Sequence, residues 1–189
     1  MVKVVKFGGS SLADAEQFKK VAAIIKAEPE RRYVVASAPG KRFSDDIKVT
    51  DMLYRCYEMI RNHENIDEYY KTIEARYNSI IRELGMSFDM SGELTYVKNA
   101  MLHASGRDYA ASRGEYLNGI ILANFLGFDF IDAAKVIFFD NKGNFDGDIT
   151  DACLGAKLDK MPKAVIPGFY GAMPDGTIKT FSRGGSDFT

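Results

Sequence analysis

A lysine, two glycines and two hydroxyl side chains stand in a row near the amino terminus, in Lys6-Phe7-Gly8-Gly9-Ser10-Ser11. Paired glycines before a helix can turn several backbone N–H groups toward one anion, and the helix dipole adds to the attraction. Lys6 would add a full positive charge at the end of the preceding apolar run. These residues suit a phosphate group. A tight strand-to-helix turn with a solvated lysine is the simpler account of a lone Gly-Gly pair.

A second glycine-rich stretch, Ser182-Arg183-Gly184-Gly185-Ser186-Asp187, lies at the other end of the sequence. An arginine beside exposed backbone can bind a carboxylate with two parallel hydrogen bonds. An ordinary surface arginine on a loop is the alternative. Under both interpretations, this stretch is predicted to be a loop.

Gly114-Glu115 interrupts a helical run, where a glycine costs about 1 kcal/mol relative to alanine. Such a glycine often marks close packing or a ligand, although a simple helix break would explain it as well. Glu115 could accept hydrogen bonds from an ammonium group, and a solvated glutamate explains it equally well.

Two hydroxyl residues are weaker candidates. Ser37 follows an apolar strand, where the loops of α/β sheets commonly meet ligands, and Thr50 is most simply the N-cap of a helix. The P-loop motif is absent, because Gly40-Lys41 is followed by Arg42. The dinucleotide G-x-G-x-x-G motif and the hydrolase G-x-S-x-G motif are absent as well.

Alternating strands and helices must position these residues. Residues 2–7 form a valine-rich strand that we expect to be buried on both faces except at its lysines, and residues 33–38 form a second strand. An amphipathic helix lies between them and ends near Pro29, which predicts a βαβ unit and a parallel sheet. Pro174-Asp175-Gly176 predicts a hairpin turn. Further helices are predicted at residues 49–62, 64–84, 92–105 and 107–126, and further strands at 128–131, 136–139, 163–167, 170–173 and 177–181.

The composition is that of a globular α/β domain, with 46% hydrophobic and 27% charged residues. The 25 basic and 26 acidic residues give a net charge of −1, so neither nucleic acid nor an anionic membrane surface is an expected partner. Two isolated cysteines, Cys56 and Cys153, suggest neither a disulfide scaffold nor a metal site. There is no signal-peptide pattern and no run of membrane-spanning length, and we expect a cytoplasmic protein.

In their order along the chain, these motifs resemble those of aspartate kinases, members of the amino acid kinase superfamily. Superfamily relatives that act on glutamate, carbamate or UMP share the lysine–glycine start, but the pair of terminal motifs favours aspartate. The shorter motifs that fall in the family's order are Ser37-Ala38, Thr50-Asp51, Gly114-Glu115, Asp132-Ala133 and Pro167-Gly168-Phe169.

The resemblance implies a three-layer α/β sandwich with a mainly parallel sheet, and ATP- and Mg²⁺-dependent phosphorylation of the side-chain carboxylate of L-aspartate. This reaction is the first step toward lysine, threonine and methionine. Lys6 would be catalytic and would be positioned by Asp187. Aspartate would contact Ser37, Thr50, Glu115 and Arg183. Phosphate would contact Gly8, Gly9, Ser10, Gly184, Gly185 and Ser186.

The resemblance also implies that residues 1–189 are the amino-acid-binding part of the kinase domain, without the nucleotide-binding half and the regulatory domains that bind an amino-acid effector. We therefore expect little or no activity from this chain alone. An incomplete sheet has an open edge, so we expect a homo-oligomer. The alternatives are a non-catalytic fragment that binds aspartate or phosphate, and an amino acid kinase for another substrate such as glutamate.

Overall fold

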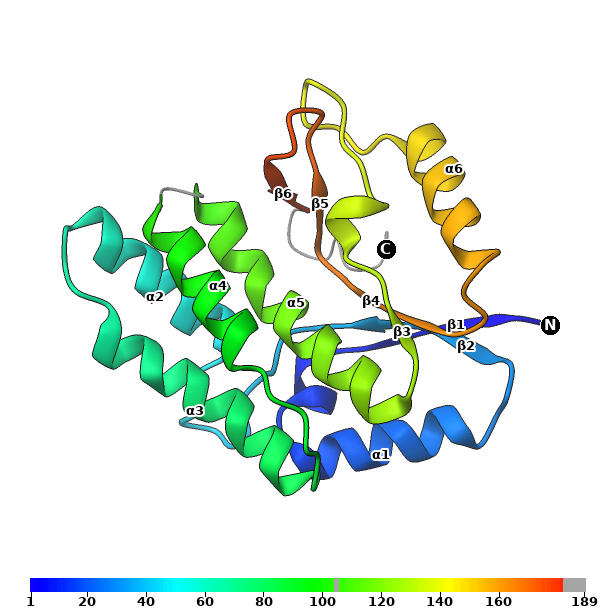
Figure 1. Ribbon diagram of the computed structural model, residues 1–189, viewed down its shortest axis with the longest axis horizontal. Helices are drawn as coiled ribbons and strands as arrows, with labels where there is room; N and C mark the ends of the chain where they lie inside the picture. The colour runs from blue at the N-terminus through cyan, green and yellow to red at the C-terminus, as the bar shows by residue number, and fades with distance from the viewer. Residues whose placement is uncertain (104–105, 182–189) are drawn as a thin grey trace.

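Four parallel strands in the order β1-β2-β4-β3 form the central sheet (Figure 1). The computed structural model describes residues 1–103 and 106–181. Lys6 pairs with Val35, and Val35 pairs in turn with Ile166, so the sheet is in register across its centre. The bounds are β1 (Lys3–Phe7), β2 (Arg31–Ala36), β3 (Asp129–Phe130) and β4 (Ala164–Pro167).

Helices cover both faces of this sheet. In Figure 1, α2, α3 and α4 gather on the side of the molecule away from α6. An antiparallel hairpin of β5 (Tyr170–Ala172) and β6 (Ile178–Thr180) follows β4. The helices are η1 (Gly9–Leu12), α1 (Ala15–Lys26), α2 (Val49–Arg61), α3 (Asp67–Glu83), α4 (Ser91–Leu102), α5 (Gly106–Leu126), η2 (Ala133–Lys135) and α6 (Gly147–Leu158).

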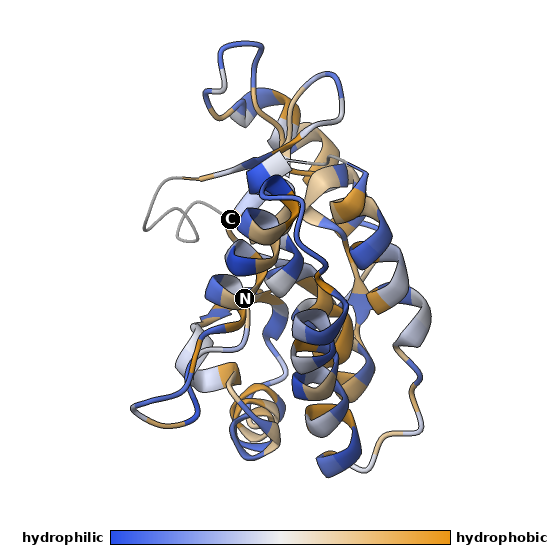
Figure 2. Ribbon diagram, turned by 90° about the vertical axis from the view of Figure 1, so that its left-hand side faces the viewer, coloured by the Kyte–Doolittle hydropathy of each residue, from blue (hydrophilic) through white to orange (hydrophobic). Residues whose placement is uncertain are grey.

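Alternate side chains of the strands enter two separate hydrophobic cores, because successive residues of a strand point to opposite faces. Val34 and Val165 pack with apolar residues of α1 and α5. Ala164 and Ile166 pack on the other side with residues around η2 and with Leu158 of α6. Figure 2 shows that the helices carry both hydrophobic and hydrophilic residues along their length. The predicted three-layer α/β class with a parallel sheet is confirmed.

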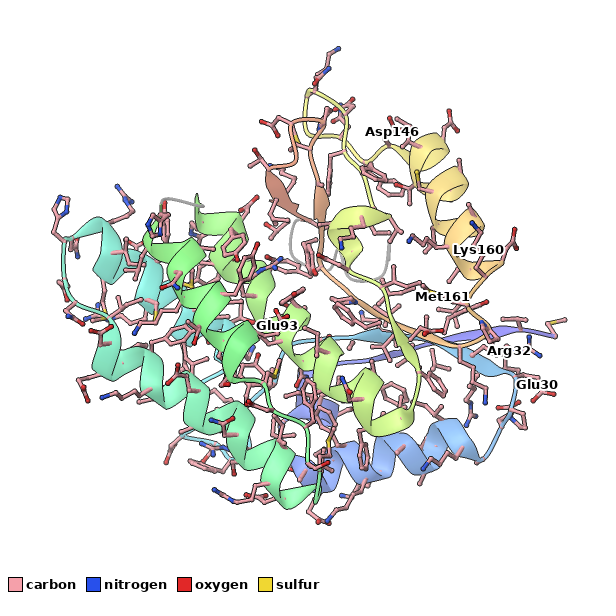
Figure 3. All side chains as sticks on the ribbon, viewed as in Figure 1. Glu30, Arg32, Glu93, Asp146, Lys160 and Met161 are labelled. Atoms are coloured by element: carbon pink, nitrogen blue, oxygen red, sulfur yellow. The ribbon has the colours of Figure 1, made fainter. Side chains whose placement is uncertain are left out.

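Helix α5 is the central helix, because it contacts the sheet on one side and α2 and α4 on the other. Most residues of α5 between Ala110 and Ala123 are buried. A helix that is buried on all sides needs small residues where other helices or strands come close to it. A Cβ atom added at Gly119 would lie 3.1 Å from the Phe130 ring and 3.2 Å from Pro167. Tyr116 of α5 donates a hydrogen bond of 2.9 Å to Glu93 of α4, a residue labelled in Figure 3.

The predicted helices and the hairpin are confirmed with shifted ends, and Gly176 in the hairpin turn has the positive φ of +83° that favours glycine. No helix among the described residues is both long and apolar enough to cross a membrane.

Two expectations about single elements were wrong, and one helix was not predicted. Residues 136–139 form no strand, since Phe138 and Phe139 make only isolated bridges to Ala172 and Phe145. Helix α6 was not predicted, because its apolar face is weak: Thr150 is its buried residue, and Leu154 and Leu158 are only partly buried against the core. Its N-cap, Asp146, accepts a hydrogen bond from the Ile149 N–H and is labelled in Figure 3. Strand β1 is an edge strand of the described sheet with Val4 63% exposed, so it is not buried on both faces.

Candidate active site

A cavity of about 450 Å³ opens between the loops that follow β1 and β2 and the middle of α5. This is the edge of a parallel sheet where ligands of open α/β proteins bind, beyond the carboxyl ends of the strands. Its size is within the ~300–1,000 Å³ range of small-molecule sites. The described residues that line it are Gly9, Ser10, Ser37, Ala38, Pro39, Gly40, Lys41, Lys48, Thr50 and Glu115.

Two glycines bring the loops after β1 and β2 into backbone contact. The Gly40 N–H donates a hydrogen bond of 2.8 Å to the carbonyl oxygen of Gly9. A Cβ atom at Gly40 would lie 2.6 Å from the Gly9 carbonyl carbon, and one at Gly9 would lie 2.9 Å from the Ala38 carbonyl oxygen. The close approach of two main chains therefore requires glycine at both positions.

Glu115 places a carboxyl group at the wall of this cavity. The residue is only 7% exposed, and its Oε2 atom has no hydrogen-bond partner among the described residues. Burial raises the pKa of Glu115 to about 8, although backbone N–H groups of Glu115 and Ala38 and the charge of Arg113 act in the opposite direction. A ligand cation at Oε2 would supply both the missing partner and the missing counter-charge.

Gly114 lets the helix that carries Glu115 approach the loop after β2. A Cβ atom at Gly114 would lie 2.7 Å from the Ala38 Cβ and 3.6 Å from the Thr50 Oγ1. The Gly114 carbonyl oxygen accepts a hydrogen bond of 2.9 Å from the hydroxyl of Tyr77. Close packing therefore explains this glycine, and a helix break does not, because α5 continues through Gly114.

Ser37 and Thr50 both line the cavity. The carbonyl oxygen of Ser37 accepts a hydrogen bond of 2.8 Å from Asn118, which is fully buried three residues after Glu115. Thr50 lies in the first turn of α2, whose N-cap is Lys48 and has no side-chain capping bond. The expectation that Thr50 is the N-cap was wrong, and its hydroxyl side chain is instead part of the cavity wall.

Lys6 and Gly8 lie beside this cavity without lining it. Val5 and Phe7 pack on the core that contains α1 and α5, so the alternation along β1 directs Lys6 to the face that carries α6. A Cβ atom at Gly8 would have no atom within 4 Å, so the backbone there is accessible. The other predicted site residues, Arg183, Gly184, Gly185, Ser186 and Asp187, lie outside the described residues.

Sequence reasoning missed two lysines and one amide in this region. Lys41 and Lys48 are exposed and lie in the loop between β2 and α2, and Lys41 donates a hydrogen bond of 3.1 Å to the Ser44 carbonyl oxygen. Asn118 fixes the Ser37 carbonyl from α5. The available signal was the Pro39-Gly40 turn after a strand, because both lysines lie in the loop that this turn begins.

The whole chain, residues 1–189, matches the model of the amino acid kinase family. The chain belongs to the amino acid kinase family. Among curated proteins, this amino acid kinase family chain is similar to aspartokinase 3 of Bacillus subtilis, with 31% identity over 100% of the chain and 44% of that protein. It is also similar to chloroplastic aspartokinase 1 of Arabidopsis thaliana, with 30% identity over 98% of the chain and 36% of that protein.

Solved structures agree with the fold of this family member. The crystal structure of Clostridium acetobutylicum aspartate kinase is 51% identical, with a TM-score of 0.95 over 97% of this chain and 42% of that one. Escherichia coli aspartokinase III in complex with aspartate and ADP has a TM-score of 0.81 at 23% identity, which supports the fold alone. The resemblance to aspartate kinases drawn from the motifs is thereby confirmed. The chain spans less than half the length of these relatives.

Proposed function

We propose that the protein containing this chain is an aspartate kinase, which transfers the terminal phosphoryl group of ATP to the side-chain carboxylate of L-aspartate. The products are 4-phospho-L-aspartate and ADP. The similarity to aspartokinases supports the reaction. The observation that carries the proposal is the buried, unpartnered Oε2 atom of Glu115, a residue that lines the cavity together with Ser37, Thr50 and the glycines of the two loops.

Aspartate binding follows from the chemistry of the cavity wall. The α-ammonium group of the substrate would pair with Glu115, because a buried carboxyl without a partner gains most from a cation. The hydroxyl groups of Ser37 and Thr50 would bind its polar groups, and Arg183 would bind one carboxylate with two parallel hydrogen bonds.

Phosphoryl transfer needs positioning and charge stabilisation more than a protein nucleophile, because the substrate carboxylate is itself the nucleophile. The proposed catalytic group is Lys6, oriented by Asp187, which would bind the transferring phosphoryl oxygens. Backbone N–H groups would bind the remaining phosphate oxygens, on one side at Gly8, Gly9 and Ser10, and on the other at Gly184, Gly185 and Ser186.

Bound ATP supplies the phosphoryl group, and Mg²⁺ neutralises charge on its phosphates. Within residues 1–103 and 106–181, no group of three or more His, Cys, Asp or Glu side chains could hold a metal ion. Mg²⁺ commonly keeps several waters and binds through phosphate oxygens, so the described residues fit an ion that enters with the nucleotide. We propose that the base and ribose of ATP contact parts of the protein beyond this chain.

The proposal also covers the pathway, the cellular location and the assembly of the whole protein. The reaction would be the first step of lysine, threonine and methionine synthesis in the cytoplasm. The whole protein would be a homo-oligomer and would bind an amino-acid effector outside residues 1–189.

An acyl-phosphate assay tests this function. Hydroxylamine traps the mixed anhydride as a hydroxamate, and we expect ATP-dependent hydroxamate from L-aspartate with the full-length protein and little or none with residues 1–189 alone. Product from L-glutamate but not L-aspartate would show another amino acid kinase specificity. Calorimetric binding of aspartate to a full-length protein that forms no product would instead favour the non-catalytic binding role.

A further inference from the structure

Arg76 of α3 is a buried arginine outside the cavity, with only 4% of its side chain exposed. Its Nη2 atom donates hydrogen bonds to the carbonyl oxygens of Gly40, at 2.6 Å, and Ala13, at 3.2 Å. Its Nη1 atom donates a longer bond of 3.4 Å to the carbonyl oxygen of Ile47. One guanidinium group thus binds three main-chain carbonyls, two of them in the loop between β2 and α2.

Asp46 supplies the counter-charge from within that loop. Its Oδ2 atom lies 3.0 Å from the Arg76 Nη1 and also accepts a hydrogen bond of 2.7 Å from the Arg42 Nε. These partners, Arg42 first, hold the pKa of Asp46 well below its usual range, so the carboxylate stays charged. Breaking the ion pair between Arg76 and Asp46 would leave a buried guanidinium group without a counter-charge, which is costly. The pair therefore holds the loop in one conformation.

The direction of these bonds determines what the loop presents on its other side. A trans peptide is planar, so the N–H of each unit points opposite to its carbonyl oxygen. With the Gly40 and Ile47 carbonyls turned toward Arg76, the N–H groups of Lys41 and Lys48 point away from it. Both lysines line the cavity, and neither N–H donates a hydrogen bond to another described residue.

We propose that Arg76 is a positioning residue that, together with Asp46, fixes this loop so that the N–H groups of Lys41 and Lys48 bind an anionic group in the cavity. The anion is a phosphoryl group or a carboxylate, since both accept hydrogen bonds from backbone N–H groups and are attracted to lysine. The inference rests on the proposed function, because it assigns this loop to the same site.

The test compares Arg76→Lys and Asp46→Asn with the matched control Arg82→Lys in the full-length protein. Arg82 lies on the same helix but is 75% exposed, and its side chain reaches no loop carbonyl among the described residues. Calorimetry measures the affinity for L-aspartate and, separately, for inorganic phosphate. Amide hydrogen exchange is followed at Lys41 and Lys48.

With the anion bound, the expected result for both variants is less protection from exchange at Lys41 and Lys48 and about tenfold weaker binding of that anion, because a displaced N–H group no longer donates a well-aligned hydrogen bond to it. A loss confined to phosphate assigns the N–H groups to the phosphoryl group, and a loss confined to aspartate assigns them to a substrate carboxylate. The control should bind both anions as the wild type does.

Other outcomes overturn the inference. If folded Arg76→Lys and Asp46→Asn bind both anions with wild-type affinity, the loop is not an anion site, while aspartate binding by the wild type would still support the proposed function. Equal losses for both anions with a lower melting temperature would show general loosening of the fold. A wild-type protein that binds neither anion would overturn the inference and the proposed function together.

Discussion

The hydroxyl of Tyr77 donates a hydrogen bond of 2.9 Å to the carbonyl oxygen of Gly114, and joins α3 to the helix that carries Glu115. Its neighbour in the sequence, Arg76, donates a hydrogen bond to the carbonyl oxygen of Gly40, another residue that lines the cavity. Two consecutive residues of α3 therefore hold two walls of one site, although neither lines it. The relative placement of Glu115 and the loop after β2 depends on this single turn of helix.

Removing the Tyr77 hydroxyl should loosen this connection. Tyr77→Phe keeps the ring but loses the hydrogen bond to Gly114, so we expect the free energy of unfolding to fall by about 0.5–1.5 kcal/mol. Denaturant unfolding measures the change. Tyr96→Phe is the control, because Tyr96 is 61% exposed and should be neutral. Equal stability of the two variants would contradict the prediction.

A methyl group at Gly40 should separate the two loops of the site. It would lie 2.6 Å from the Gly9 backbone, which cannot yield as a flexible side chain would, so Gly40→Ala should cost about 1–3 kcal/mol. The control is Gly155→Ala in α6, where a Cβ would meet nothing within 4 Å and should add about 0.5–1 kcal/mol of helix stability. Thermal melting should therefore shift in opposite directions for the two variants.

The raised pKa of Glu115 predicts a pH-dependent stability. In the unfolded chain this carboxyl loses its proton near pH 4.5, while in the folded chain it keeps the proton to about pH 8. The unfolded state thus binds fewer protons between these values, and the contribution of Glu115 to stability falls as the pH rises from about 4.5 to about 8.

Glu115→Gln cannot titrate, so its stability relative to the wild type should increase from pH 5 to pH 8, by a few kcal/mol at most. Denaturant unfolding across this range measures the difference. Parallel stability profiles for the two proteins would mean that Glu115 is not a high-pKa group in the folded chain.

Aspartate binding should release a proton at pH 7. Glu115 is mostly protonated there without ligand, and a substrate ammonium group would favour its carboxylate form. Binding heats measured in buffers of different ionisation enthalpy should therefore differ, with up to about one proton released per site. Glu115→Gln should remove the buffer dependence. A wild-type heat that does not vary with the buffer would argue against ammonium binding at Glu115.

Much of the fold could be predicted because its signals are local. The alternation of apolar runs and the Pro174-Asp175-Gly176 turn each act over a few residues, and the parallel sheet and hairpin followed from them. Glu115 could be identified as a candidate because its neighbour Gly114 lies inside a predicted helix. A glycine there lowers helix stability, which suggests a packing or binding role at that position. The burial of β1 could not be predicted, because its position at the edge depends on strand order.

The Arg76 contacts were missed because they join distant segments. The spacing of Ile73, Tyr77 and Ile80 places Arg76 on the buried stripe of α3, which was the available signal. A charged residue on such a stripe needs partners, but nothing local shows that they are carbonyls in the loops near Ala13 and Gly40.

The pairing of Val35 with Ile166 also has a consequence for how the chain folds. Val35 and Ile166 are far apart in the sequence, and the helices from α2 to α6 lie between them. Such distant pairings form slowly because a long stretch of chain must first be closed into a loop. The described residues that line the cavity all precede β4. We expect their loops and helices to assemble early, and the docking of β4 and its hairpin to complete the sheet as the slow step.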